Sequence, residues 1–233
     1  MKIVKNDLFD YENRYIFQYD KGFKFSLDSI LLAEYIKLPK KGVLLDMCTG
    51  NAPIPLIVST KYDNQIYAFE IQKEIADLAQ KSVELNCLGK QIHIINDDVN
   101  NISNYFNSEL FDVISCNPPY FKNNIVNYNK NDILSIARHE ITINLEQIFL
   151  IASKYLKLKG NLYLVQRSER LDDIIYYARI NNIPVKEIQF ISTKKGGNPI
   201  IVLVRCSKNG KPGIKVKRVL DVSNSCTYKN MFG

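Results

Sequence analysis

Short apolar runs alternate with longer amphipathic segments along most of this chain. Each run is rich in Val, Ile, Leu and Phe and ends in a polar or Gly-bearing turn, which predicts a buried strand followed by a helix. The predicted strands are residues 43–47, 65–69, 91–95, 110–116, 161–166, 185–192 and 200–206. The predicted helices are residues 25–36, 72–86, 145–156 and 170–180, with a further helix after Pro53 and Pro55. This order of elements predicts an α/β fold.

Small and turn-forming residues mark the ends of several predicted elements. Ser26 is the N-cap of the first helix, Gly89 lies just beyond the helix at 72–86, and Gly160 stops the helix at 145–156. The last two strands are joined by residues 194–199, a turn rich in Gly, Lys and Pro that is too short for a crossover helix. We therefore expect a mostly parallel, seven-stranded sheet whose last strand runs antiparallel.

The predicted elements form one continuous series without an internal repeat or a linker. We expect a single domain over residues 1–233, which is enough chain for a full core. Residues 1–40 precede the first strand and are expected to form an amino-terminal cap segment of that domain. Residues 208–233 follow the last strand and are expected to form a basic carboxyl-terminal tail.

The composition is that of an ordinary globular protein, with 46% hydrophobic and 24% charged residues. No apolar run reaches the roughly 18 residues of a membrane span, and the first residues lack the pattern of a signal peptide. We therefore predict a cytoplasmic protein that does not contact a membrane, and we expect a monomer. The formal charge of +7 is compatible with a polyanionic partner.

Cysteines and histidines are too few and too scattered for a metal site or a disulfide framework. The chain has only two histidines, and no two cysteines form a Cys-x-x-Cys pair. The five cysteines are Cys48, Cys87, Cys116, Cys206 and Cys226. We expect reduced thiols that lie mostly in the core, and no bound metal.

The tetrapeptide Asn117-Pro118-Pro119-Tyr120 directly follows the predicted strand 110–116. The prolines fix the local backbone and give up two donors, so that nearby carbonyl groups point in set directions. The Asn117 side-chain oxygen and the Pro118 carbonyl can accept hydrogen bonds from a planar amine, and Tyr120 offers a stacking face. Ligands bind beyond the carboxyl ends of strands in open α/β sheets, which favours a substrate pocket here. In the alternative interpretation the prolines only end the strand and Tyr120 covers it.

Three further strand ends carry residues that suit a nucleoside cofactor. Residues 46–52 form a tight turn in which Gly50 lets a ligand approach the backbone and the next helix offers free N–H groups. Glu70, about 20 residues later, is placed to bind ribose hydroxyls, and Asp98 is placed to accept a hydrogen bond from an adenine amino group. Each also has a simpler explanation, since Glu70 can cap the helix that starts near Gln72 and Asp98 can be an ordinary turn residue.

These motifs resemble those of the class I methyltransferases that use S-adenosylmethionine to modify exocyclic or amide nitrogens. The resemblance rests on Asp46-Met47-Cys48-Thr49-Gly50-Asn51, Glu70, Asp98 and Asn117-Pro118-Pro119-Tyr120. Residues 22–33, together with Arg138-His139-Glu140 and the basic carboxyl-terminal segment, are more specifically similar to bacterial tRNA methyltransferases that modify N6 of adenine 37. The resemblance spans nearly the whole chain and implies a Rossmann-like class I methyltransferase fold.

The resemblance also implies which residues form the site. The implied ligands of S-adenosylmethionine are Phe25, Asp46, Cys48, Gly50, Asn51, Glu70, Ile71, Asp98 and Asn117. The implied catalytic residues are Asn117, Pro118, Pro119 and Tyr120. Two glycines of the family's Gly-x-Gly-x-Gly turn are replaced here, and we interpret Cys48 as a packing residue.

The partner implied by the resemblance is tRNA. Basic side chains are expected to contact its phosphates, namely Arg138, Lys194, Lys195, Lys211, Lys215, Lys217 and Arg218. The two acceptors at the tetrapeptide would hold both N6 hydrogens and favour the tetrahedral nitrogen that forms during methyl transfer. Tyr120 would stack on an adenine that has left its own base stack.

Other functions of similar proteins stay open. Glutamine-N5 methyltransferases of release factors carry the same tetrapeptide, but they have a separate amino-terminal helical domain for which residues 1–40 leave no room. Guanine-N2 methyltransferases of ribosomal RNA differ mainly after the prolines and in extra domains. A noncatalytic RNA-binding module would not require the tetrapeptide. A NAD-dependent dehydrogenase fits least, because the glycine turn is degraded and a proton donor is lacking.

Overall fold

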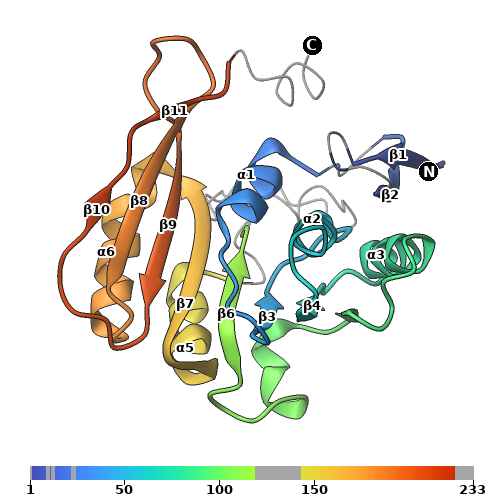
Figure 1. Ribbon diagram of the computed structural model, residues 1–233, viewed down its shortest axis with the longest axis horizontal. Coiled ribbons are helices and arrows are strands. Elements are labelled where there is room, and N and C mark those ends of the chain that lie inside the picture. The colour runs from blue at the N-terminus through green and yellow to red at the C-terminus, as the bar shows by residue number, and fades with distance from the viewer. Residues whose placement is uncertain (1, 9–10, 12–13, 22–24, 119–142, 224–233) are drawn as a thin grey trace, which may run out of the picture.

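The computed structural model describes residues 2–8, 11, 14–21, 25–118 and 143–223, which form an α/β fold (Figure 1). The strands are β1 (Ile3–Asp7), β2 (Tyr15–Tyr19), β3 (Val43–Asp46), β4 (Gln65–Phe69), β5 (Ile92–Ile95), β6 (Phe111–Cys116), β7 (Leu156–Arg167), β8 (Val185–Ser192), β9 (Ile201–Ser207), β10 (Lys215–Val216) and β11 (Leu220–Asp221). The α-helices are α1 (Leu27–Tyr35), α2 (Pro53–Val58), α3 (Lys73–Leu85), α5 (Leu145–Tyr155) and α6 (Leu171–Ile180). Two 3₁₀ helices are η1 (Val99–Asn104) and η2 (Ser168–Arg170).

The main sheet has nine strands within the described residues. Eight of them follow the order β10-β8-β9-β7-β6-β3-β4-β5, and β11 also pairs with β8. The pairings from β7 through β6, β3 and β4 to β5 are all parallel. Strand β9 runs antiparallel to both of its neighbours, β7 and β8. The predicted fold class is therefore confirmed, and the seven predicted strands are β3 to β9.

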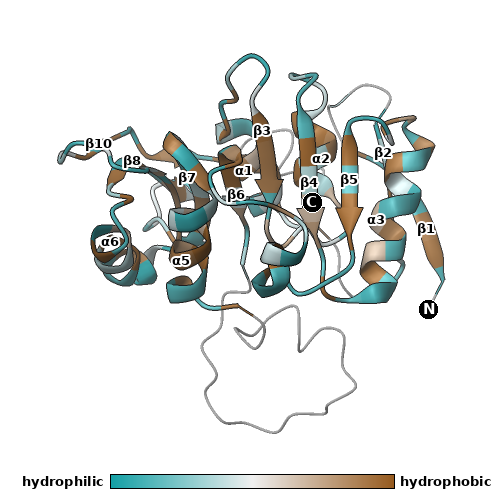
Figure 2. Cartoon of the chain, turned by 90° about the horizontal axis from the view of Figure 1, so that it is seen from below, coloured by the Kyte–Doolittle hydropathy of each residue, from teal (hydrophilic) through white to brown (hydrophobic). Residues whose placement is uncertain are grey.

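Helices cover both faces of the main sheet. Helices α1 and α2 pack on one face, where Leu32 and Ile57 belong to a buried apolar cluster. Helices α5 and α6 pack on the other face, where Phe149 and Ile174 belong to a second cluster. The strands between these layers are largely apolar, whereas the helices turn polar sides outward (Figure 2). Burial on both faces explains why the parallel strands read as nearly continuous hydrophobic runs in the sequence.

The two glycines that were expected to end helices do not do so, although both helices end within one residue of the predicted position. Helix α5 ends at Tyr155 and β7 follows without a turn. Gly160, which was expected to stop this helix, lies buried inside β7, where an added Cβ would meet the Asp112 carbonyl oxygen at 3.1 Å. This close approach accompanies an irregularity in the pairing of β6 with β7. After α3, Cys87 rather than Gly89 takes the left-handed conformation, with a φ of 57°.

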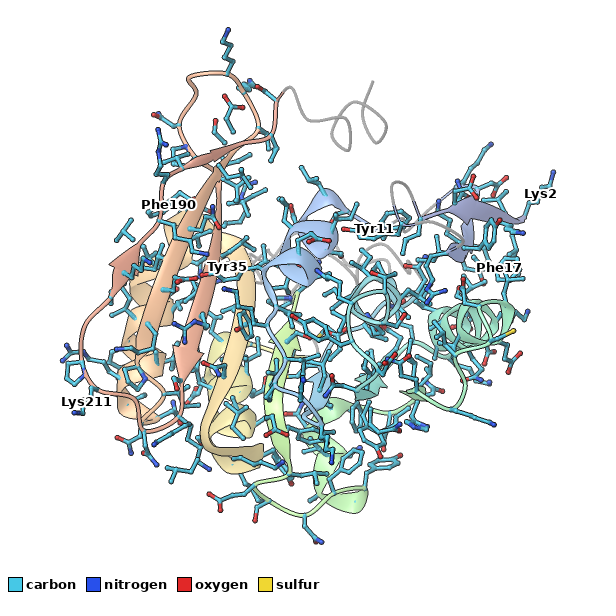
Figure 3. All side chains as sticks on the ribbon, viewed as in Figure 1. Lys2, Tyr11, Phe17, Tyr35, Phe190 and Lys211 are labelled. Carbon is cyan, nitrogen blue, oxygen red and sulfur yellow. The ribbon has the colours of Figure 1, made fainter. Side chains whose placement is uncertain are left out.

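Both ends of the described chain contain strands that the hydrophobic pattern does not predict. At the amino end, β1 and β2 pair as an antiparallel two-stranded sheet. This small sheet lies beside α3 (Figure 3), and the Phe17 N–H of β2 donates to Ser82 Oγ of α3 at 2.9 Å. At the other end, β10 and β11 pair with successive parts of β8. Part of the segment expected to be a basic tail therefore pairs with β8, along the lateral side of the main sheet.

Candidate functional site

The carboxyl ends of four neighbouring strands meet at one edge of the sheet. Strands β6, β3, β4 and β5 are adjacent in that order. Backbone hydrogen bonds continue past the ends of these strands, since the Thr49 N–H donates to the Phe69 carbonyl at 2.9 Å and the Glu70 N–H to the Ile95 carbonyl at 3.0 Å. The predicted site residues that follow these strands therefore form one row, at the edge where α/β sheets bind ligands.

The turn after β3 contains two residues in the left-handed conformation. Gly50 has a φ of 58° and Ala52 a φ of 71°, and α2 begins with Pro53 directly afterwards. Glycine adopts this conformation without strain, whereas alanine does so at a cost that is typical of ligand-binding turns. Asn51, between them, donates from Nδ2 to the Phe17 carbonyl at 3.0 Å. Strand β2 therefore braces the turn from outside.

Asp46, the last residue of β3, is completely buried. Its Oδ1 accepts a 2.7 Å hydrogen bond from the Ser115 hydroxyl of β6. Burial raises the pKa of Asp46 to about 6, and the hydrogen bond from the Ser115 hydroxyl acts against this rise. Within the described residues, Asp46 Oδ2 and Asn51 Oδ1 are buried without a hydrogen-bond partner. Unsatisfied acceptors of this kind are costly, so the turn suits a ligand that brings a positive charge or hydrogen-bond donors.

Glu70 lies buried at the end of β4 and receives two backbone N–H groups. Its Oε2 accepts from Gly50 at 2.9 Å and its Oε1 accepts from Gln72 at 2.9 Å. Burial raises the pKa of Glu70, and the two backbone hydrogen bonds act against this rise. The carboxylate thus links the β3 turn to the start of α3, while each oxygen keeps a second lone pair that suits a ribose hydroxyl. The bond to the Gln72 N–H resembles the capping role, although the N-cap residue of α3 is Gln72, and the contact of Glu70 with a ribose stays a prediction.

The part of the edge formed by β4 and β5 contains two further predicted ligands of S-adenosylmethionine, Ile71 and Asp98. Ile71 is 40% exposed, which leaves an aliphatic surface beside Glu70. Asn96 supports this segment by donating from Nδ2 to the Glu70 carbonyl at 2.9 Å. Asp98 is the N-cap of η1, where it accepts from the Asn100 N–H at 2.9 Å. Asp98 therefore has the turn role of the simpler interpretation, and its contact with adenine stays a prediction.

Asn117 and Pro118 directly follow β6. Asn117 is half-buried and donates from Nδ2 to Ser29 Oγ of α1 at 2.9 Å. Pro118 is buried, and Phe25 is buried just before α1. Three other predicted site residues lie outside the described residues, namely Pro119, Tyr120 and Arg138.

Two thiols, one in the turn after β3 and one just before Asn117, pack against each other. The sulfur atoms of Cys48 and Cys116 are 3.9 Å apart. Burial raises the pKa of the Cys116 thiol well above its usual range, and the neighbouring Cys48 adds to the rise. Cys116 is thus a neutral core residue. The contact fits the packing role expected for Cys48, whose place in the cofactor site stays a prediction.

Two serines support the predicted residues, although the sequence does not single them out. Ser115 holds Asp46, and Ser29 holds Asn117. The sequence contains weak signals for both, since Ser115 interrupts an apolar strand and Ser29 lies in the stretch 22–33 that carries the family resemblance. Neither signal says which side chain the serine contacts.

The predicted RNA-binding residues lie at different ends of the sheet. Lys194 and Lys195 are exposed on the turn after β8, at the same edge as the candidate site. Lys211 precedes β10 and lies at the opposite end of the β8–β9 hairpin (Figure 3). Lys217 Nζ is 3.0 Å from Glu187 Oε1, so this lysine forms an ion pair within the protein. The remaining members lie in or just after β10, namely Lys215 and Arg218.

The polar groups at this edge are carboxylates, amides and hydroxyls. In the part of the chain that the structure describes, no group of three or more His, Cys, Asp or Glu is arranged to hold a metal ion. The described helices also include none that is long and apolar enough to cross a membrane.

Comparison with known families establishes the class of protein to which this chain belongs. The methyltransferase small domain family matches residues 24–176, more than half of the chain, including the β3 turn, Glu70 and Asn117. The chain belongs to this family. The row of strand ends is therefore the candidate active site of a methyltransferase.

Individual relatives of this methyltransferase have informative names. The tRNA1(Val) (adenine(37)-N6)-methyltransferase of Bacteroides thetaiotaomicron is 24% identical over 222 residues, which cover 94% of this chain and 92% of that protein. The protein of the same name from Porphyromonas gingivalis is 26% identical over 182 residues, which cover 75% and 71%.

Solved structures share the fold of this methyltransferase at low sequence identity. A predicted O-methyltransferase from Agrobacterium tumefaciens gives a TM-score of 0.67 at 18% identity and covers 86% of this chain and 89% of that chain. TYW2 from P. horikoshii, solved in complex with MeSAdo, gives a TM-score of 0.60 at 11% identity, covering 85% and 70%. These likenesses establish the fold alone.

Proposed function

We propose that this methyltransferase transfers a methyl group from S-adenosylmethionine to N6 of adenine in tRNA, at position 37 beside the anticodon. The observation that carries the proposal is the position of Asn117 and Pro118 at the end of β6, next to the strained turn that follows β3. The names of relatives that cover nearly the whole chain support the choice of adenine N6 and tRNA.

The residues of the β3 and β4 ends suit the proposed methyl donor. Asp46 and Asn51 offer buried acceptor atoms, which match the polar, cationic part of S-adenosylmethionine. Glu70 is proposed to hold its ribose, and the exposed Ile71 to pack on its adenine ring. When bound, S-adenosylmethionine supplies an electrophilic methyl group, which the protein only has to orient.

The acceptor nitrogen needs orientation rather than a strong base. The lone pair of adenine N6 is delocalised into the ring, and its protons are too weakly acidic for a side chain to remove beforehand. We propose that Asn117 Oδ1 and the Pro118 carbonyl accept the two N–H groups and favour a tetrahedral nitrogen. Such groups stabilise the positive charge that develops on nitrogen as the methyl arrives, and the surplus proton leaves to water afterwards.

The approach of tRNA is proposed to involve the basic turn after β8. Lys194 and Lys195 are exposed at the same edge as Asn117, where they can contact phosphates while the base enters the site. We propose that the adenine leaves its stack and rests on Tyr120. A tRNA substrate would place the protein in the cytoplasm.

The proposal is tested with a defined RNA. The purified protein is incubated with labelled S-adenosylmethionine and an unmodified tRNA1(Val) transcript, and the digested nucleosides are identified by mass spectrometry. We expect N6-methyladenosine, and we expect it to be absent when position 37 carries guanine. Label in N2-methylguanosine or in the glutamine of an added release factor would support one of the alternatives instead. A catalytically silent protein would contradict the proposal.

A further inference from the structure

The catalytic amide has a contact that neither the family nor its relatives' names assign. The Asn117 side chain donates from Nδ2 to Ser29 Oγ at 2.9 Å. Ser29 is 4% exposed and lies in the first turn of α1, whose backbone holds it through the bond from the Ser29 N–H to the Ser26 carbonyl at 3.1 Å. In Figure 1 the tip of the β6 arrow points toward α1. The serine is therefore a fixed, buried partner for the amide.

The orientation of this amide matters for the proposed reaction. An Asn side chain has one acceptor end and one donor end, and rotation by half a turn exchanges them. Only the oxygen can accept an N–H of the substrate amine, whereas the NH₂ end would meet it donor to donor. Because Ser29 Oγ contacts the NH₂ end, the oxygen is the end of the Asn117 amide that does not face this serine.

We infer that Ser29 is a positioning residue that holds the Asn117 amide with its oxygen toward the substrate nitrogen. This inference rests on the proposed function for its effect on methyl transfer, and on the structure for the contact itself. The contact joins residues that are 88 positions apart in the chain. It couples the amino-terminal helix α1 to the catalytic turn, so that α1 contributes to chemistry as well as to packing.

Substitution of Ser29 should separate turnover from binding. Ser29→Ala removes the acceptor, and the amide is then held less firmly in this orientation. We expect kcat at saturating tRNA to fall by about tenfold to a hundredfold, the size of effect that misplacement of a reacting group has. The KM for tRNA and the Kd for S-adenosylmethionine should stay within about twofold of wild type. Ser29→Thr keeps a hydroxyl acceptor and should recover most of the turnover.

A matched control distinguishes this effect from a general loss of packing. Ser59, at the end of α2, is also buried, and its Oγ donates to the Leu56 carbonyl at 2.7 Å. Ser59→Ala therefore removes a comparable buried hydroxyl away from Asn117, and its kcat should stay near that of wild type. If Ser29→Ala does not fold, Ser29→Cys serves instead, because cysteine keeps the volume but is a weak acceptor.

A spectroscopic measurement tests the contact independently of activity. In protein labelled with ¹⁵N-asparagine, the NH₂ signals of Asn117 are identified by their absence in Asn117→Ala. We expect Ser29→Ala to shift or broaden these signals, and Ser59→Ala to leave them in place. Unchanged signals together with a kcat within about twofold of wild type would overturn the inference. If the wild-type protein methylates no tRNA, the proposed function fails, whereas the Asn117 signals still decide whether Ser29 holds the amide.

Discussion

Replacing Asp46 by asparagine removes a buried negative charge and keeps the size of the side chain. Asp46 is completely buried, and burial raises its pKa from 3.8 to about 6. This rise in the pKa corresponds to about 3 kcal/mol. The unfolding free energy is lower by about this amount when the carboxyl of the folded protein is charged. We therefore expect Asp46→Asn to gain stability relative to wild type at neutral pH.

The direction of the pH dependence follows from proton binding. Between about pH 4 and pH 6 the folded protein keeps a proton on Asp46 that the unfolded chain has released. The stability associated with this proton is fully present below pH 3.8 and is lost as the pH rises through 6. The asparagine variant has no such loss. Its unfolding free energy minus that of wild type should therefore increase by about 2 to 3 kcal/mol from pH 4 to pH 7.

Urea denaturation followed by circular dichroism at pH 4, 5, 6 and 7 measures this difference. Asp77→Asn is the matched control, since Asp77 is an exposed carboxylate on α3 whose partner is Lys73 at 3.0 Å. Its difference from wild type should change little over the same range, because exposed ion pairs contribute little. A difference for Asp46→Asn that is the same at pH 4 and pH 7 would refute the reasoning. Weaker binding of S-adenosylmethionine by this variant, measured by calorimetry, would show why the costly carboxylate is kept.

Three further predictions concern catalysis, packing and RNA binding. Asn117→Ala should lower kcat at least a hundredfold while the Kd for S-adenosylmethionine stays near wild type, and comparable turnover would remove Asn117 from the mechanism. Gly160→Ala should cost about 1 to 3 kcal/mol in urea denaturation because its Cβ would be 2.9 Å from a backbone oxygen, whereas Gly89→Ala, with no atom within 4 Å, should not destabilise the protein. Exchange of Lys194 and Lys195 for Glu should weaken tRNA binding and flatten its dependence on salt, as measured by filter binding; an unchanged salt slope would exclude both from phosphate contact.

The hydrophobic pattern predicts the sheet well where strands are buried on both faces. Strands β4 and β8 have the predicted bounds, because their apolar residues end at clear turns. The pattern fails where long-range pairing decides the structure. Helix α5 ends at Tyr155 and β7 starts at Leu156 because Leu156 pairs with Phe111 of β6, and no local breaker marks that change. Strands β10 and β11 are two residues long each and depend on β8 for their hydrogen bonds.

The candidate site divides in the same way. The sequence predicts residues whose role depends on their place at a strand end, such as Asp46 and Glu70, because that place follows from the order of strands. It does not predict the partners that orient them. Ser115 lies 69 positions from Asp46 and Ser29 lies 88 positions from Asn117, so only the folded structure joins them. Asp98 lies at the end of β5 as the sequence predicts, but its carboxylate caps η1, which the sequence does not specify.

The amino-terminal segment contacts both halves of the site. From β2, the Phe17 carbonyl accepts a hydrogen bond from the Asn51 side chain in the turn after β3. From α1, the Ser29 hydroxyl accepts a hydrogen bond from the Asn117 side chain, which follows β6. The methyl donor is proposed to lie against Asn51 and the acceptor base against Asn117. The geometry between donor and base therefore depends on the amino-terminal segment, which lies outside both β3 and β6. A substitution that shifts β2 should therefore change the alignment of the two substrates before it changes the stability of the main sheet, because β2 pairs with β1 in a separate two-stranded sheet.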